Sequence, residues 1–219
     1  MRPVVCFVTD RNKYGVNWKD ELVERVRLAA VSGVHLIQVR ERGLNDNELL
    51  ELVSQCVKAV INTSCRVLVN NRFDIALAAG AHGVHLPSDG ITASRLRAYA
   101  PEDFIIGRSV HSKEEAKDAG SNGDVDYLLF GTIYPSQSKP GVTAAGVDLL
   151  EVVSQAVALP ILAIGGVSVE NIQEILHLLM ILWKAPLKLQ IKFVKLIKIG
   201  ITNNPNLDQA KFHFKYSIL

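Results

Sequence analysis

Two asparagines stand side by side where an apolar stretch of the chain ends, at Asn70 and Asn71 in VLVNNRFDIALAAG. Their carboxamides can hydrogen-bond to a polar ligand, but they are poor ligands for magnesium, which prefers anionic oxygen. Polar side chains also follow other apolar stretches, and these are Gln38, Arg40, Arg42, His85, Ser88, Asp89, Arg108, Ser109 and His111. A site lined by several basic groups and hydroxyls suits a phosphorylated ligand.

A glycine pair, Gly165-Gly166, follows the apolar stretch PILAI. Glycine lets the backbone approach a phosphate closely, and a helix that begins near Ser168 would point free N–H groups at it. An ordinary tight turn between a strand and a helix explains the pair equally well. The loop PSQSKPG adds the hydroxyls of Ser136 and Ser138 and the ammonium of Lys139. This loop can close over an anion, or it can be a solvated surface loop.

Three further side chains have two interpretations each. His111 lies between a predicted strand and a predicted helix, so it is a candidate general acid or base, although a lone histidine beside a helix start is more often structural. Arg40 can bind phosphate through two N–H groups, or it can pair with Glu41 inside the fold. His85 alternates with Val84 and Leu86, which favours a packed histidine over a metal ligand.

The elements that must position these residues alternate regularly. Apolar strands are predicted at residues 4–9, 35–40, 66–70, 83–87, 104–110, 126–131 and 160–166. Helices are predicted at residues 18–30, 45–61, 91–100, 112–120 and 147–157, with a short one that ends at Gly80 and a seventh after Ser168. This alternation predicts a parallel sheet covered by helices, and seven or eight units favour a TIM (β/α)₈ barrel. An open doubly wound sheet is less favoured, because the turn TDRNKYG lacks the GxGxxG fingerprint.

Composition excludes several classes of protein. The chain has 219 residues, of which 48% are hydrophobic, enough for one large α/β domain. A formal net charge of +2 gives no reason to expect nucleic acid or a membrane as partner. The three cysteines lack CxxC spacing, no signal peptide precedes the first predicted strand, and no apolar run approaches the roughly 20 residues of a membrane span. We therefore expect a cytoplasmic location, and the oligomeric state stays open.

The composition changes from His177 onward. Lysines dominate this segment, and Asp208 is its single acidic residue. We therefore divide the chain into a barrel at residues 1–176 and a divergent segment at residues 177–219. The alternating stretch LKLQIKF, residues 187–193, is the candidate for the strand that would close the barrel in an atypical eighth unit. Without that closure we expect a weakly stable protein.

Five stretches resemble the thiamin phosphate synthase/TenI family, and they occur in that family's order. They are IQVRER, LVNNRFDIALAAGAHGVHLPSDG, IIGRSVHSKEEAKDAG, DYLLFGTIYPSQSKPG and LPILAIGGVSVENIQ. The resemblance covers roughly residues 4–176, and it implies a (β/α)₈ barrel that handles phosphorylated thiazole in thiamin biosynthesis. The synthase branch joins hydroxymethylpyrimidine diphosphate to thiazole phosphate, and magnesium neutralises the pyrophosphate that leaves.

The resemblance also implies which residues bind substrate. The second strand matches the pattern Q-x-R-x-K at Gln38 and Arg40, with Arg42 in the lysine position. Asn70 matches a contact to the pyrimidine, and Ser109 matches a serine after the fifth strand. The phosphate-binding set implied by the family is Ser136, Ser138, Lys139, Gly165 and Gly166.

Two departures concern magnesium. The synthase has an aspartate at the position of Asn71 and another at the position of Gly90, whereas Asp89 stands one residue early. Loss of both carboxylates should weaken magnesium binding severely. We therefore expect no cofactor and no metal ligand, with Asp89 as the one candidate and magnesium needed only if the protein is a synthase.

The short stretches LPS and GRSVHS are more similar to the TenI-like branch than to the synthase branch. In the TenI-like branch a related enzyme shifts a proton to aromatise thiazole carboxylate phosphate. That enzyme uses a histidine where this chain has Thr132, so His111, with Ser109, is the catalytic candidate. The leading interpretation is a TenI-like protein that binds thiazole phosphate. The alternatives are a thiamin phosphate synthase and a non-catalytic regulatory protein that binds thiamin phosphate.

Overall fold

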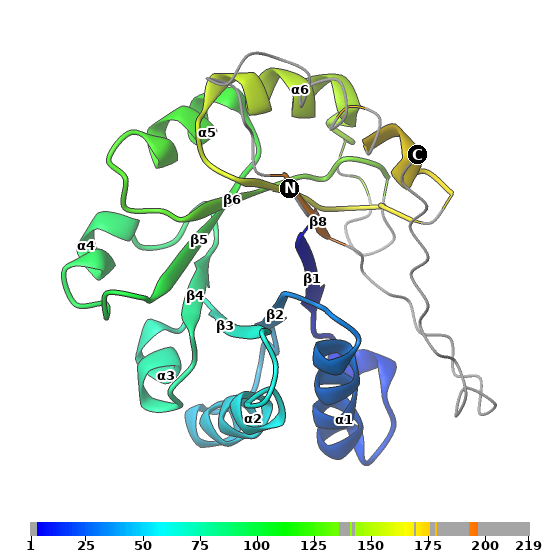
Figure 1. Cartoon of the computed structure of the whole chain (residues 1–219), viewed down its shortest axis with the longest axis vertical. Coiled ribbons are helices and arrows are strands. Elements are labelled where there is room, and N and C mark those ends of the chain that lie inside the picture. Colours follow the sequence, from blue (N-terminus) through cyan, green and yellow to red (C-terminus); the bar gives the residue numbers. More distant parts are fainter. Residues whose placement is uncertain are drawn as a thin grey trace.

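The computed structural model describes residues 4–135, 141, 143–168, 170–175, 178 and 193–196. Eight parallel strands form a closed barrel in chain order, and helices surround it (Figure 1). The strands are β1 Val4–Val8, β2 Leu36–Val39, β3 Arg66–Asn70, β4 Gly83–Leu86, β5 Ile105–Val110, β6 Tyr127–Phe130, β7 Ile161–Ala163 and β8 Phe193–Leu196. The predicted TIM (β/α)₈ architecture is therefore confirmed.

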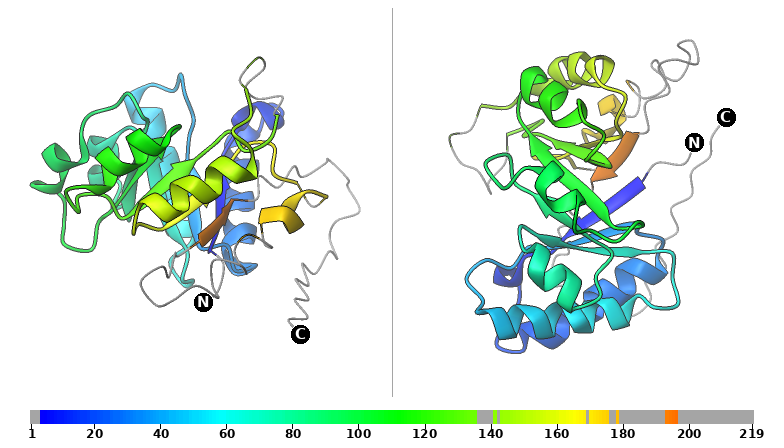
Figure 2. Two further views of the ribbon diagram at one scale, coloured as in Figure 1. Left: turned by 90° about the horizontal axis from the view of Figure 1, so that it is seen from above. Right: turned by 90° about the vertical axis from the view of Figure 1, so that its left-hand side faces the viewer.

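The helices follow the strands as the sequence predicts. They are α1 Trp18–Val31, α2 Asp46–Ala59, α3 Phe73–Ala78, α4 Ala93–Arg97, α5 Lys113–Gly120 and α6 Gly146–Ala156, with a 3₁₀ turn at Arg11–Lys13 and helical backbone at residues 172–175. Figure 2 shows that the helices lie outside the ring of strands. No helix among the described residues is long and apolar enough to cross a membrane.

Alternation along the strands separates two apolar clusters. One cluster fills the barrel, and its buried members are Cys6, Leu68, Tyr127, Leu129 and Leu162. The other lies between the strands and the helices, and includes Ile37, Val67, Val84, Ile106 and Val110. Because successive side chains of a strand point to opposite faces, Gln38, Asn70 and Ser109 share the barrel-facing side with Leu36, Leu68 and Ile105.

The strand that closes the barrel overlaps the predicted stretch at one described residue. β8 pairs with both β1 and β7, so the barrel is closed by the chain's own late segment. It begins at Phe193, the last residue of LKLQIKF, and continues to Leu196. Residues 187–192 lie outside the described residues, as does most of the segment 177–219. The domain boundary at residue 176 and the low stability therefore stay predictions.

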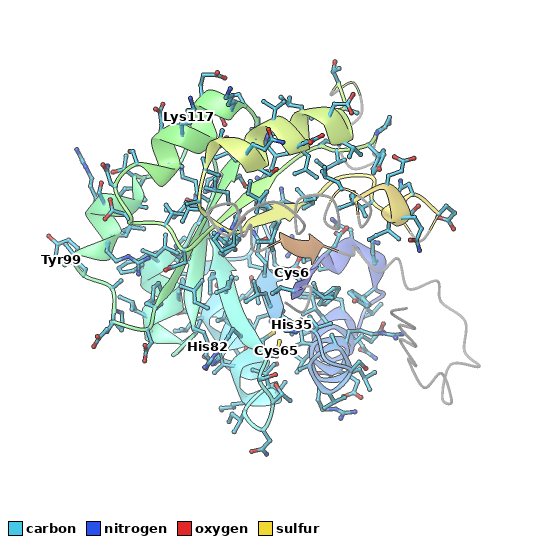
Figure 3. All side chains as sticks on the ribbon, turned by 45° about the horizontal axis from the view of Figure 1, so that its top comes forward. Cys6, His35, Cys65, His82, Tyr99 and Lys117 are labelled. Carbon is cyan, nitrogen blue, oxygen red and sulfur yellow. The ribbon has the colours of Figure 1, made fainter. Side chains whose placement is uncertain are left out.

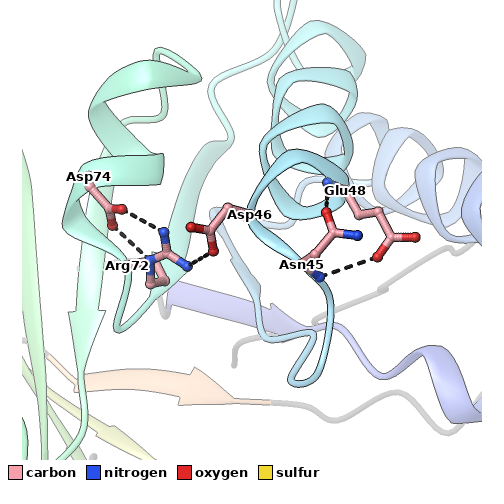
Figure 4. A network of polar contacts seen from close by, with 5 residues as sticks. All are labelled: Asn45, Asp46, Glu48, Arg72 and Asp74. Carbon is pink, nitrogen blue, oxygen red and sulfur yellow. Dashed lines mark hydrogen bonds and ion pairs between the residues drawn. The ribbon is translucent and has the colours of Figure 1, made fainter.

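Two helix starts carry side-chain caps. Asn45 and Glu48 form a complete capping box at α2 (Figure 4). At α5, the Ser112 hydroxyl accepts a hydrogen bond from the Glu115 N–H at 3.1 Å. The Glu115 carboxylate, however, accepts from the N–H of His111 at 2.8 Å rather than completing a box with Ser112. Glu115 therefore also fixes the backbone that carries His111.

Candidate active site at the carboxyl ends of the strands

The first part of the site is a carboxamide pair inside the barrel. The Gln38 side chain on β2 donates from Nε2 to Oδ1 of Asn70 on β3 at 3.0 Å. Gln38 is only 3% exposed, so this hydrogen bond holds its amide in one orientation. The two residues lie near the carboxyl ends of neighbouring strands, and in a (β/α)₈ barrel this end carries the catalytic and binding residues.

Asn71 and Gly90 lie side by side although 19 positions separate them in the chain. Asn71 has a left-handed backbone with φ of 58°, which asparagine tolerates better than most residues. A Cβ added to Gly90 would lie 3.3 Å from Asn71 Oδ1. The two positions implied as metal carboxylates are therefore adjacent, and neither carries a carboxylate.

The loops after β3 and β4 are poorly suited to bind magnesium. No group of three His, Cys, Asp or Glu residues capable of holding a metal occurs among the described residues. Asp89 is exposed at the tip of the loop after β4. A carboxamide beside a glycine offers one neutral oxygen, which is a weak donor set for a hard cation.

Two arginines anchor the loops after β3 and β4. Arg72 donates to Asp46 and Asp74, with N–O distances of 2.6 Å for both ion pairs, and so ties the loop after β3 to the start of α2 (Figure 4). Arg108 donates to the carbonyl oxygens of Ser88 and Ile91, both at 2.8 Å. Because Arg108 alternates with Ser109 on β5, it faces the helix layer and holds the β4 loop from outside.

A buried trio links β4, β5 and β6. Nε2 of His85 lies 2.8 Å from Ser109 Oγ, and Nδ1 lies 2.8 Å from the Tyr127 hydroxyl. His85 is 1% exposed, which confirms the predicted packed histidine. Burial, together with the charges of Arg40 and Arg108, lowers the pKa of His85 to about 3, so the ring is neutral near pH 7.

Arg40 follows β2, and its backbone N–H donates to Thr9 Oγ1 at 3.0 Å. Arg40 forms no ion pair with any described residue. The alternative interpretation, a pair with Glu41 inside the fold, is therefore not seen among these residues. Glu41 instead accepts from the Arg11 N–H at 3.0 Å. Burial, and next the charge of Arg42, lower the pKa of Arg40. An anion would relieve the repulsion between these two guanidinium groups.

The glycine pair after β7 packs against the loop after β6. Gly165 and Gly166 have φ of 97° and 63°, a region that favours glycine. A Cβ on Gly165 would lie 2.6 Å from Thr132 Cγ2, and one on Gly166 would lie 2.4 Å from the Pro135 carbonyl oxygen. Packing alone therefore requires both glycines. The turn also adjoins Pro135, the residue before Ser136, Ser138 and Lys139, which lie outside the described residues.

His111 reaches the same loop from β5. Its Nδ1 lies 2.6 Å from the carbonyl oxygen of Gly131. A carbonyl can only accept, so Nδ1 carries a proton, and no described residue hydrogen-bonds to Nε2. The imidazole therefore lies beside Thr132, the position at which the tautomerase pattern has its histidine.

The other two barrel histidines are structural. Nδ1 of His35 accepts from the Val5 N–H at 3.1 Å, and Nδ1 of His82 accepts from the Val67 N–H at 3.0 Å. They precede β2 and β4, at the amino ends of these strands, and both are labelled in Figure 3. Sequence reasoning missed Tyr127 as a partner in the site. The mid-strand glycine in FIIGRSV was the available signal, since such a glycine often marks a close approach.

A parallel eight-stranded barrel with polar groups at the carboxyl ends of its strands defines a TIM-barrel protein with a small-molecule type of site. The chain belongs to the thiamine monophosphate synthase family, because the sequence model of that family matches residues 5–179.

Similar proteins agree with this assignment. Thiamine-phosphate synthase of Acidothermus cellulolyticus is 37% identical over 147 residues, which cover 67% of this chain and 69% of the relative. Thiamine-phosphate synthase of Methanospirillum hungatei is 39% identical over 145 residues, covering 66% and 70%. The structure of thiamine phosphate pyrophosphorylase from Pyrococcus furiosus superimposes with a TM-score of 0.71 at 28% identity, covering 88% of this chain and 84% of that one.

Proposed function

We propose that the protein is a thiamine phosphate synthase that joins hydroxymethylpyrimidine diphosphate to thiazole phosphate. Relatives named thiamine-phosphate synthase, 37% and 39% identical, support this activity over the TenI-like tautomerase expected from two short motifs. The observation that carries the proposal is the Gln38–Asn70 pair, which presents aligned amides at the carboxyl end of the barrel. Such a pair suits the ring nitrogen and amino group of an aminopyrimidine.

In this reaction the bond between the pyrimidine methylene carbon and the diphosphate oxygen breaks, and pyrophosphate leaves with the electron pair. The thiazole nitrogen then forms the new carbon–nitrogen bond. Gln38 and Asn70 orient the pyrimidine, while Arg40, Arg42 and Ser109 receive the anionic leaving group.

The thiazole phosphate lies in this proposal against the turn after β7. No described residue accepts a hydrogen bond from the N–H of Gly166 or Val167, which makes these two groups candidate donors to the phosphate. The family resemblance assigns Ser136, Ser138 and Lys139 to the same phosphate, and these three lie outside the described residues. No step is assigned to magnesium, because Asn71 and Gly90 do not supply its usual carboxylates.

The test is product formation from the two phosphorylated precursors, followed as thiamine phosphate, with magnesium and with a chelator. Gln38→Ala should lower the rate about tenfold or more, since it removes a substrate contact and frees Asn70. Gln155→Ala is the matched control, because Gln155 is exposed on α6 and its amide hydrogen-bonds to Glu151 of the same helix. Absence of product in both buffers would contradict the proposal.

His111 favours one second candidate, the TenI-like isomerisation of thiazole carboxylate phosphate. Its proton on Nδ1 is held by Gly131, so Nε2 can accept a proton beside Thr132. Conversion of the isomeric thiazole phosphate, abolished by His111→Asn and not by His82→Asn, would support this activity. Binding of thiamine phosphate by calorimetry without turnover in either assay would instead favour the non-catalytic regulatory protein.

A further inference from the structure

Three residues of neighbouring strands form one register row inside the barrel. His85 on β4 pairs with Gly107 on β5, and Gly107 pairs with Tyr127 on β6. A Cβ on Gly107 would lie 2.0 Å from Tyr127 Cζ and 2.3 Å from its hydroxyl oxygen. The tyrosine ring therefore occupies the space of the missing side chain and stacks on His85, with ring centroids 5.6 Å apart.

The hydrogen atoms of this trio can be assigned by elimination. Tyr127 is 5% exposed, and burial raises the pKa of its phenol well above the usual value, so the hydroxyl keeps its proton. A buried hydroxyl must donate, and His85 Nδ1 is its acceptor among the described residues. Nδ1 is then unprotonated, and the neutral ring carries its proton on Nε2.

The same elimination extends to Ser109. The Nε2–H group of His85 donates to Ser109 Oγ, so the Ser109 oxygen is the acceptor in this hydrogen bond. The hydroxyl proton of Ser109 is left without a protein acceptor among the described residues. Ser109 is the last barrel-facing residue of β5, so this proton is available to a ligand at the carboxyl end of the barrel, its mouth.

We propose that Tyr127 and His85 are positioning residues that fix Ser109 as a hydrogen-bond donor toward a phosphate or diphosphate group at the barrel mouth. The hydroxyl could otherwise donate to His85 and present only lone pairs, which would repel an anion. With the donor direction fixed in advance, no reorientation is needed when charge develops on the leaving group. The ligand class rests on the proposed function, whereas the proton arrangement does not.

The direct measurement is the tautomer of His85 in the ligand-free protein, from long-range proton–nitrogen correlation spectra near pH 7. His85→Gln identifies the signals by their loss. The expected result is protonated Nε2 and bare Nδ1. Protonated Nδ1, or a doubly protonated ring, would overturn the proposal. Because no substrate is present, this result is independent of the synthase assay, which can fail while the arrangement holds.

A double-mutant cycle separates positioning from a merely structural role. Ser109→Ala should weaken binding of inorganic pyrophosphate about tenfold, and Tyr127→Phe about threefold, through loss of a charge-assisted hydrogen bond and of its orientation. The double variant should bind no more weakly than Ser109→Ala alone. Additive effects would mean that Tyr127 does not act through Ser109.

The control is Tyr99→Phe, which removes the same hydroxyl from an exposed tyrosine and should leave pyrophosphate binding and the His85 signals unchanged. Failure of the natural chain to bind pyrophosphate or phosphate at millimolar concentration would overturn the anion-binding part. If Tyr127→Phe fails to fold, the spectrum of the natural protein still decides the tautomer.

Discussion

Two neighbouring regions of the barrel mouth differ in how strongly their residues depend on one another. On β4 to β6, His85, Ser109 and Tyr127 are linked by two hydrogen bonds of 2.8 Å around a glycine that cannot bear a side chain. At the ends of β3 and β4, Asn71 and Gly90 lie in loops open to solvent. We expect a substitution in the first region to disturb the barrel interior. In the second region we expect mainly a change in ligand chemistry, although a Cβ on Gly90 would lie 3.0 Å from the Pro87 ring.

The sharpest test of this contrast is Gly107→Ala. The added methyl group would overlap the Tyr127 ring, and both lie in the packed barrel interior. We expect a loss of about 3 kcal/mol in the free energy of unfolding, at the upper end for overpacking, measured by urea denaturation. Gly15→Ala is the control, because an added Cβ there would meet nothing within 4 Å. Equal, small effects would show that the trio is not tightly packed.

The open region is tested by restoring carboxylates, in the double variant Asn71→Asp with Gly90→Asp. The two side chains would be adjacent, so they should bind magnesium and raise the magnesium-dependent affinity for pyrophosphate about tenfold or more. Calorimetry with and without magnesium measures this gain. Asp89→Asn in the natural chain is the companion variant. A loss of magnesium dependence there would identify Asp89 as a displaced ligand and reverse our view of this edge.

The smallest expected effect concerns Glu41, a buried acid near the same mouth. Its Oε1 has no hydrogen-bond partner among the described residues, and burial raises its pKa. The folded state therefore holds this proton more tightly than the unfolded state, so stability falls as pH rises above the ordinary glutamate pKa.

Glu41→Gln should remove this dependence and stabilise the protein by about 1 kcal/mol near pH 7, with less gain near pH 4. Thermal unfolding at both pH values measures the difference. Glu24→Gln is the control of opposite sign, because Arg27 lowers the pKa of the exposed Glu24 carboxylate. A gain that grows toward low pH at Glu41 would contradict the assignment.

Much of the architecture could be predicted from local pattern. Strand positions such as 66–70 and the Asn45 and Ser112 caps depend on alternation and on side-chain chemistry within a few residues. The closing strand was harder to place, because the described strand β8, Phe193–Leu196, overlaps the predicted residues 187–193 only at Phe193 and its pairing with β1 spans almost the whole chain. No local periodicity records such a long-range partner.

By itself, the sequence determined the barrel class, the polar character of the strand ends and the absence of aspartate at residues 71 and 90. These follow from composition and short-range pattern. Only the tertiary structure decided that Asn71 lies against Gly90, that Tyr127 fills the space above Gly107, and that His85 bonds to Ser109. The physical reason is register: each contact joins neighbouring strands or the loops that follow them, and only the pairing of those strands brings the side chains to one level.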